Sequence, residues 1–330
     1  MKSENVIFEA LAIDNNAATS SSLGEVGKNT SVAEIYIKNA IISLVSLKKH
    51  NQDSTVGLVI NIELDDKWKR QLTENGIEIW MCPFDTFVMP KHFVYSLSYY
   101  KLCAFDFILK NTDYKRICFI DCDTFGVKNF ADIWTEVDNA FLIIPNESSH
   151  HAKTRTEINT LHELLTGQKN KTITHFSSGF IAGTRSEVTK VIDLCEEVYK
   201  KLVTFEEYKP KGGDEIVWSP ALAKYNGRIH SPKCYCLLSF ISASNYWMDK
   251  ERWDDPDVIM WHLPGDKRYS LIWAYDYFNK KGVIPPVEKM ASASRFRHVR
   301  PHFTWLALRA ILKDTSSISR NIKKLFQKAQ

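Results

Sequence analysis

Short apolar runs and helical apolar stripes alternate along the first 145 residues of this chain. Residues 6–13 form an apolar run that predicts a strand, and residues 33–48 place their apolar side chains on one face of a helix. The same pattern predicts further strands at 55–64, 76–80 and 116–120 and further helices at 66–75 and 97–109. Strands that alternate with helices predict an α/β fold, with a mostly parallel sheet covered by helices on both faces.

The second half of the chain is less regular. It contains a strand-like run at 180–182, an amphipathic helix at 187–202 and an apolar strand at 258–261 that leads into His262. A polar, serine-rich stretch at 17–31 predicts a loop. No internal repeat or low-complexity segment is present in the sequence. We therefore expect a single α/β domain.

The composition is that of an ordinary globular protein and excludes wholesale disorder, because 44% of the 330 residues are apolar and 25% are charged. Most of the seven cysteines lie in apolar runs, so we expect buried, reduced thiols and a reducing compartment. The first residues lack a secretory signal, and no apolar run approaches the ~20 residues of a membrane span. We expect a cytoplasmic protein.

The charge is unevenly distributed. Residues 295–330 hold nine Lys or Arg and one acid, so this segment carries +8 and the rest of the chain carries −4. The segment also contains Phe303 and Trp305, and aromatic anchors beside basic residues suit a helix on an anionic membrane surface. We predict a globular domain at 1–288 and a basic tail at 289–330 that holds the protein on the inner face of the membrane.

The alternative for this tail is a C-terminal helix that packs on the body and has a basic solvated face. Nucleic acid is not an expected partner, because the acidic body offers no extended positive surface.

Two carboxylates, Asp121 and Asp123, directly follow the apolar strand at 116–120. Open α/β sheets bind ligands at the carboxyl ends of their strands, and paired carboxylates suit a hard cation such as Mg²⁺ or Mn²⁺. A second Asp-x-Asp, Asp255-Pro-Asp257, precedes a strand and predicts a polar turn. We expect Asp123 to lie at the surface of a cleft. Phosphatases of the haloacid-dehalogenase type are disfavoured, because Thr124-Phe125 follows the first pair where they have Gly-Thr.

The surrounding residues resemble family 8 glycosyltransferases, which include glycogenin and the bacterial lipooligosaccharide galactosyltransferases. The resemblance rests on Tyr99-Tyr-Lys101-Leu, then Arg116-Ile-Cys-Phe-Ile-Asp-Cys-Asp-Thr, then Asn129-Phe-Ala-Asp-Ile-Trp134. It implies a GT-A fold, which is a Rossmann-like nucleotide-sugar-binding fold, with a UDP-sugar donor, Mn²⁺ (or Mg²⁺) and transfer with retention at the anomeric carbon.

Three later segments resemble the family in the right order: Phe176-Ser-Ser-Gly179, Gly212-Gly-Asp214-Glu215, and His262-Leu-Pro-Gly265-Asp-Lys267. Four departures stand beside them. Ser177 replaces an Asn, Glu215 stands where Gln is usual, the spacing from Gly265 to Lys267 is one residue short, and Arg268-Tyr269 replaces Pro-Trp.

The resemblance implies roles for individual residues. Asp121, Asp123 and His262 would ligate the metal. The donor would be bound by Asp14 (on uracil or ribose), Lys101, Asp121 (also on ribose), Cys122, Asp123, Gly265 and Lys267 (on the diphosphate). The candidate catalytic residues are Lys101 and the two carboxylates Asp214 and Glu215. One of the two carboxylates would stabilise oxocarbenium-like charge on the sugar.

Most of these residues also have a structural alternative. Asp121 and Asp123 could belong to a solvated turn at the end of a strand. Asp214 could cap a helix, Asp14 could be a loop aspartate, His262 a core histidine, and the two lysines ordinary surface groups.

The sequence therefore predicts a metal-dependent, retaining glycosyltransferase that moves a hexose from a UDP-sugar to a cell-envelope or capsule glycan, either free or lipid-linked. A nucleotidyl- or phosphotransferase is an alternative, although residues 10–16 lack the glycines of a phosphate loop. A non-catalytic membrane adaptor is another. Double displacement and front-face attack both remain open as routes to retention.

Overall fold

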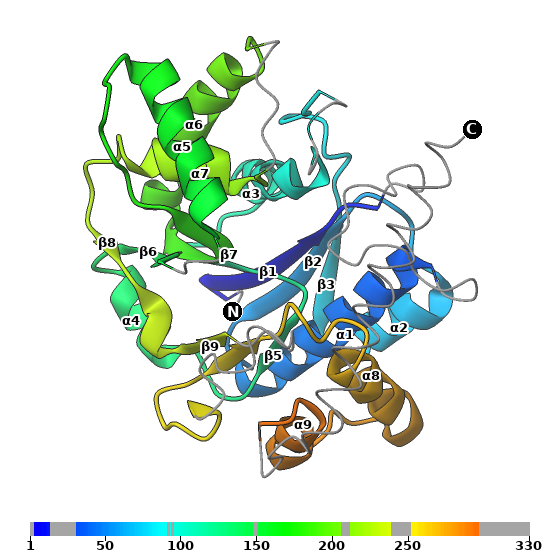
Figure 1. Cartoon of the computed structure of the whole chain (residues 1–330). Coiled ribbons are helices and arrows are strands. Elements are labelled where there is room, and N and C mark those ends of the chain that lie inside the picture. Colours follow the sequence, from blue (N-terminus) through cyan, green and yellow to red (C-terminus); the bar gives the residue numbers. More distant parts are fainter. Residues whose placement is uncertain are drawn as a thin grey trace, which may run out of the picture.

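A computed structural model describes residues 3–13, 31–90, 93, 96–147, 151–205, 212–238 and 252–296 (Figure 1). Within this part, a seven-stranded sheet has the order β3-β2-β1-β4-β7-β6-β8. The strands are β1 (Asn5–Leu11), β2 (Thr55–Ile60), β3 (Ile77–Met81), β4 (Arg116–Ile120), β6 (Phe141–Pro145), β7 (Phe176–Thr184) and β8 (Ile229–His230). Every neighbouring pair in this sheet is parallel except the two pairs that β7 makes, with β4 and β6. The predicted, mostly parallel sheet is confirmed.

Helices cover both faces of the sheet, as the alternating pattern predicts (Figure 1). One face carries α1 (Val32–His50), α2 (Asp66–Thr73), α4 (Ala131–Val137), α8 (Ser270–Lys281) and α9 (Val287–Ala293). The other face carries α3 (Tyr100–Asn111), α5 (Ala152–Thr166), α6 (Arg185–Leu202) and α7 (Glu215–Leu222), and the 3₁₀ turn η1 (Ser96–Tyr99) leads into α3. A parallel strand between two helical layers is buried on both sides, which explains the apolar run of β1, interrupted only by Glu9.

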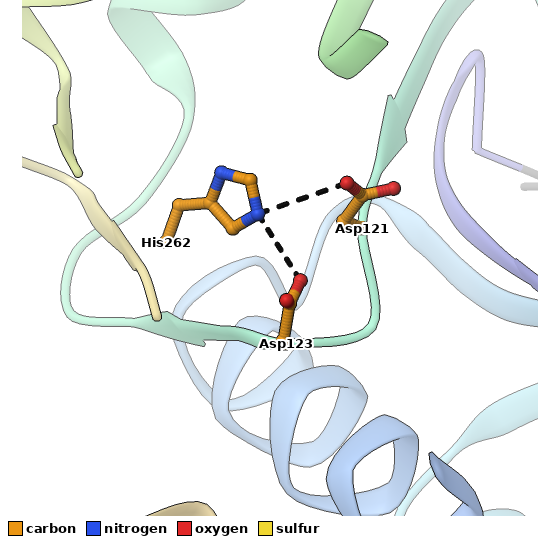
Figure 2. Close-up of side chains that lie close together, drawn as sticks. All are labelled: Asp121, Asp123 and His262. Atoms are coloured by element: carbon orange, nitrogen blue, oxygen red, sulfur yellow. Dashed lines mark hydrogen bonds and ion pairs between the residues drawn. The ribbon is translucent and has the colours of Figure 1, made fainter. Parts of the chain in front are cut away.

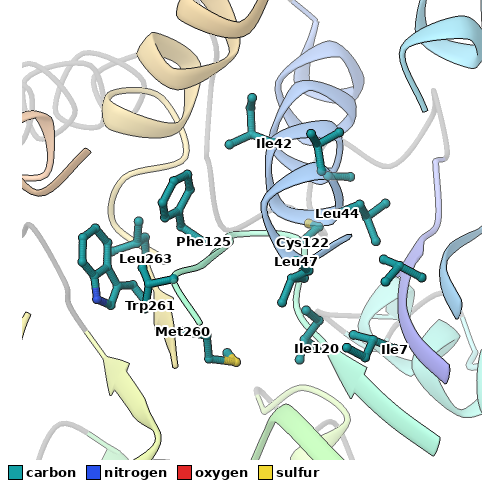
Figure 3. Close-up of a cluster of buried hydrophobic side chains, with 14 of the residues drawn as sticks. Ile7, Ile42, Leu44, Leu47, Ile120, Cys122, Phe125, Met260, Trp261 and Leu263 are labelled. Carbon is teal, nitrogen blue, oxygen red and sulfur yellow. The ribbon is translucent and has the colours of Figure 1, made fainter. Parts of the chain in front are cut away.

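A smaller sheet completes the site-bearing edge. Its strands are β5 (Thr124–Gly126), β10 (Met260–His262) and β9 (Cys236–Leu238), with the 3₁₀ turn η3 (Pro232–Cys234) just before β9. β10 runs antiparallel to β5 and pairs His262 with Thr124. Figure 3 shows the apolar cluster that fixes this sheet against α1, in which the Phe125 and Trp261 rings stack with centroids 5.8 Å apart. Because of this pairing, His262 lies close to the carboxyl end of β4.

Several elements differ from the sequence prediction. β7 is longer than the predicted run at 180–182 and runs antiparallel to its neighbours β4 and β6. β5, directly after the Asp pair, was not predicted as a strand. The helices α5, α8 and α9 lie in the half of the chain that has weak periodicity, and α4 is a seven-residue helix too short to show a clear period. All seven cysteines are free thiols, and six of them are buried, as predicted.

The beginning of the predicted tail is part of the folded body. The boundary at 288/289 falls within α9, and the Phe296 ring meets the Trp261 ring edge-on at 5.1 Å. Residues 297–330, Asp14 and most of the predicted loop at 17–31 lie outside the described residues. Among the described residues, no helix combines the length and the apolar character that crossing a bilayer requires.

Candidate active site

The two aspartates at the end of β4 are held by hydrogen bonds from both sheets. The backbone N–H of Asp121 donates to the carbonyl oxygen of Gly179 in β7, at 3.0 Å. The N–H of Leu263, just after β10, donates to the carbonyl oxygen of Asp123 at 2.8 Å. Both carboxylates are therefore placed where the large sheet and the small sheet meet.

His262 joins the two aspartates in a compact cluster. Its Nε2 lies 3.1 Å from Oδ1 of Asp123 and 3.7 Å from Oδ2 of Asp121 (Figure 2). One ligand atom from each of the three side chains lies within 4.8 Å of the others. Two carboxylate oxygens and one imidazole nitrogen form a donor set that fits Mn²⁺ and also accommodates Mg²⁺. The three residues that the sequence resemblance implies as metal ligands do come together, and Asp121, Asp123 and His262 are called the metal-ligand cluster below.

Gly179 makes room for this cluster. A Cβ atom at position 179 would lie 2.6 Å from Cε1 of His262 and 3.1 Å from Oδ2 of Asp121. The first distance is too short for any side chain, so residue 179 must be glycine for His262 and Asp121 to approach each other as they do. Sequence analysis recorded Gly179 only as part of a motif and gave it no role.

Lys267 lies on the metal-ligand cluster. Its side chain is about 10% exposed, its ammonium forms an ion pair with Asp123, and it also lies 3.4 Å from the carbonyl oxygen of Pro264. Asp123 is 2% exposed, so it is buried rather than at the cleft surface as predicted. Burial alone would raise the pKa of Asp123, but Lys267 and His262 outweigh it and hold that pKa well below its usual range. Asp123 therefore stays ionised.

Lys101 bridges the metal-ligand cluster and the candidate catalytic carboxylates. Its Nζ lies 2.8 Å from Oδ1 of Asp121 and 3.9 Å from Oδ2 of Asp214, and it donates to Oγ of Ser178 at 3.0 Å. Burial alone would lower the pKa of Lys101, but Asp121 and Asp214 raise it above its ordinary value. The buried ammonium is thus fully charged, and neither Lys101 nor Lys267 is a surface lysine.

Asp214 occupies the N-cap position of α7, but its side chain makes no capping hydrogen bond. Instead, Oδ2 accepts a hydrogen bond of 3.0 Å from Nε1 of Trp218. Its backbone N–H donates to Oγ of Ser98 at 2.9 Å. Burial raises the pKa of Asp214 to about 6, since Lys101 only partly offsets the cost of charging it there. The helix-cap alternative is therefore wrong for the side chain.

Glu215 has a partner that sequence analysis missed. Its Oε2 lies 2.7 Å from Nε2 of His175, whose side chain is fully buried just before β7. A carboxylate can only accept, so the imidazole donates from Nε2 and fixes the direction of the Glu215 side chain. His175 lies beside the Phe176-Ser-Ser-Gly179 motif, and this proximity was the available signal.

The remaining predicted donor-binding residues differ in position. The side chain of Cys122 is buried in the apolar cluster that contains Leu44 and Leu47, so it is part of the core (Figure 3). Gly265 lies in the turn that carries Lys267, while Asp14 lies outside the described residues.

Glu9 of β1 is a second group that sequence analysis missed. It is fully buried, and burial raises the pKa of its carboxyl well above the usual range.

Comparison with solved structures identifies related folds. WbbM, a bifunctional glycosyltransferase, is 11% identical to this chain with a TM-score of 0.51; the match covers 89% of this chain and 52% of WbbM, so the chain spans about half of the length of that protein. Mouse xyloside xylosyltransferase 1 is 12% identical, with a TM-score of 0.48 and coverage of 78% and 97% respectively. No family model and no curated protein sequence matches the chain. The chain has the GT-A-like fold of a glycosyltransferase, with its Asp-x-Asp pair at the carboxyl end of β4.

Proposed function

We propose that this protein is a metal-dependent, retaining glycosyltransferase of the family 8 type. It would transfer a hexose from a UDP-sugar to a cell-envelope or capsule glycan. One observation carries the proposal: Asp121, Asp123 and His262 form a cation-binding cluster between two buried lysines, at the carboxyl edge of a glycosyltransferase fold. A structural aspartate pair would not need a histidine brought from 139 residues away.

The positions of the two lysines support a diphosphate-binding role. When bound, a divalent cation would neutralise the carboxylates and the negative charge that builds on a leaving diphosphate. Lys267 now neutralises Asp123, and it would turn its ammonium to the diphosphate once the carboxylate has another cationic partner. Lys101 holds Asp121 in place and lies between the metal ligands and Asp214.

Asp214 and Glu215 are placed to act on the sugar. Lys101 connects Asp214 to the metal-ligand cluster, and Glu215, next in the chain, has 20% of its side chain exposed for contact with a substrate. Either carboxylate would stabilise positive charge at the anomeric carbon. His175 orients Glu215. A glycosyl-enzyme adduct trapped on Glu215 would favour double displacement, and its absence would favour front-face attack.

The test is a UDP-release screen over UDP-glucose, UDP-galactose, UDP-GlcNAc and UDP-GalNAc, each with Mn²⁺ and with Mg²⁺. We expect release from at least one donor that is abolished by EDTA. The comparison variant is Asp257→Ala, which removes a carboxylate from the other Asp-x-Asp pair and should leave UDP release unchanged. The proposal is overturned if none of the four donors releases UDP, or if none of them binds to the protein in the presence of Mn²⁺.

We further propose that residues 297–330 bind the protein to anionic lipid. This segment holds eight Lys or Arg and one acid, together with Phe303 and Trp305. Each basic residue near such a surface contributes about 1 kcal/mol. Deletion of 297–330 should release the protein from phosphatidylserine vesicles, with wild-type binding falling as salt rises. The deletion starts after Phe296 because the ring of this residue packs on Trp261. Salt-independent sedimentation of the wild type would contradict this proposal.

A further inference from the structure

A shallow groove lies between the first turn of α8 and the helix α9. Its volume is about 490 Å³, and it is lined by Tyr269, Ser270, Trp273, Lys289, Ser292 and Ala293. Tyr269 is 55% exposed and Trp273 is 38% exposed, which is unusual for aromatic side chains that line one depression. Exposed aromatic groups that cluster in a groove commonly mark a ligand-binding surface.

Backbone hydrogen bonds connect this groove to the metal-ligand cluster. The N–H of Leu263 donates to the backbone carbonyl oxygen of Asp123 at 2.8 Å. In the same way, the N–H of Asp266 donates to the carbonyl oxygen of Leu263 at 2.9 Å, and the N–H of Tyr269 to that of Asp266 at 2.8 Å. Tyr269 is two positions after Lys267, so their Cα atoms lie at most about 7 Å apart, and Trp273 lies about 6 Å further along α8. The groove is therefore next to the diphosphate side of the site and is rigidly positioned relative to it.

The groove residues match the chemistry of a sugar. A pyranose ring has apolar C–H faces, and an aromatic ring presents a negative face that attracts such C–H groups. Tyr269 and Trp273 stand one helical turn apart and so share a face of the chain. Ser270 also lines the groove; this residue is 2% exposed, and its buried Oγ has no hydrogen-bond partner among the described residues. A hydroxyl-rich ligand would supply one.

Lys289 adds a charge preference. Its Nζ lies 5.5 Å from the centre of the Tyr277 ring, and the centres of the Tyr277 and Trp273 rings lie 5.7 Å apart. The ammonium is thus held beside the aromatic surface, where it would attract a carboxylate on a bound sugar.

We infer that this groove is a carbohydrate-binding subsite for the acceptor, which holds a sugar unit beyond the one that receives the transferred hexose and favours glycans that carry carboxylates. The inference deepens the proposed function and rests on it. Binding energy from such a remote unit would position the reacting hydroxyl at the metal-ligand cluster.

The test is glycan binding to the full chain, followed by saturation-transfer NMR and titration in the absence of UDP-sugar and metal. Maltotriose is the neutral probe and a hyaluronan tetrasaccharide is the acidic one. We expect both to bind, the acidic one more tightly. Trp273→Ala should weaken both about five- to tenfold, and Trp273→Tyr should restore most of the binding. Lys289→Gln should weaken only the acidic glycan.

Leu164→Ala is the matched control, because Leu164 is similarly exposed but lies on α5. Its glycan binding should equal that of the wild type. Failure of the wild type to bind either probe, or equal binding by Trp273→Ala and wild type, would overturn the inference. Loss of vesicle binding in Trp273→Ala with glycan binding unchanged would make this a membrane surface instead. Absence of UDP release by the wild type would overturn the proposed function, whatever the glycans do.

Discussion

The two Asp-x-Asp pairs of this chain lie at opposite ends of the same short ladder between β5 and β10. Asp121 and Asp123 precede β5, and Asp255 and Asp257 precede β10. Because β10 pairs antiparallel with β5, the start of one strand lies beside the end of the other. The first pair therefore meets His262, while the second lies beside Val127, whose N–H donates to Ile259 at 2.8 Å.

The surroundings of the two pairs differ in every respect that matters for chemistry. Asp123 is buried and neighbours Lys267 and His262. Asp255 accepts from the backbone N–H of Asp257 at 2.9 Å and from Arg252 Nε at 3.0 Å, so it forms the predicted polar turn. The motif alone is uninformative. What distinguishes the pairs is their place in the fold: the first lies at the edge of the large sheet with a histidine and two buried lysines, whereas the second lies in a partly exposed turn with Arg252.

The largest contrast should appear when each pair loses one carboxylate. Asp123→Ala should lower UDP release about a thousandfold or more, because metal stabilisation of a leaving group contributes several kcal/mol. Asp257→Ala should change it less than twofold. Asp123→Ala also leaves Lys267 without its buried partner, so the melting temperature of this variant is measured beside its activity. Asp123→Asn serves as the milder change. Turnover close to wild type in a folded Asp123→Ala protein would contradict the metal-ligand assignment.

A second contrast concerns two buried carboxyls: the pKa of Asp123 is held below its usual range, whereas the pKa of Asp214 is raised. The pKa of Asp214 is raised to about 6 from an ordinary value of 3.8, so between these pH values the folded chain binds a proton that the unfolded chain releases. Stability from this group is therefore complete below about pH 4 and is lost as pH rises through 6. The difference between a pKa of 3.8 and one of about 6 corresponds to about 3 kcal/mol in the free energy of unfolding.

Urea unfolding in metal-free buffer measures this effect. The free energy of unfolding of Asp214→Asn, relative to wild type, should rise by about 3 kcal/mol between pH 4 and pH 7. Asp138→Asn is the control of opposite sign, because Arg116 lowers the pKa of that exposed carboxyl. Parallel pH curves for wild type and Asp214→Asn would show that Asp214 titrates normally.

His262 tests whether the ladder itself builds the metal-ligand cluster. His262→Ala would remove one of the three proposed ligands, so Mn²⁺ affinity should fall by at least about ten- to a hundredfold, which is the cost of losing an outer-shell partner alone. His230→Ala is the control, since this histidine is exposed, lies in the edge strand β8 and pairs with Glu136. Calorimetric titration with Mn²⁺ measures both variants. Equal Mn²⁺ affinity for His262→Ala and wild type would make this histidine structural.

Sequence analysis found the local features and missed the ones that need tertiary pairing. The apolar runs of β1, β2 and β4 and the helical stripes of α1 and α6 carry their own periodicity, so their positions were predictable. The strands β5 and β9 have three residues each, too few to show a period.

The same distinction holds within the site. Asp121, Asp123, His262, Lys101 and Lys267 were found through motifs. His175 and Ser178 were not, because their partners, Glu215 and Lys101, are far away in the chain. The reversed direction of β7 was also invisible, and it is this strand that brings Gly179 to Asp121.

Gly179 allows the finest test, through a comparison of two glycines on β7. A Cβ at position 179 would contact His262 and Asp121, whereas a Cβ at position 183 would lie 3.0 Å from Phe141 and 3.2 Å from Val188, in the apolar core. Gly179→Ala should therefore push the metal ligands apart and weaken Mn²⁺ binding about tenfold, since one methyl group displaces a ligand without removing it. Gly183→Ala should lower the melting temperature through overpacking and leave Mn²⁺ affinity unchanged. If both variants lose stability and neither changes Mn²⁺ affinity, the close approach at Gly179 serves packing of the strand rather than the metal ligands.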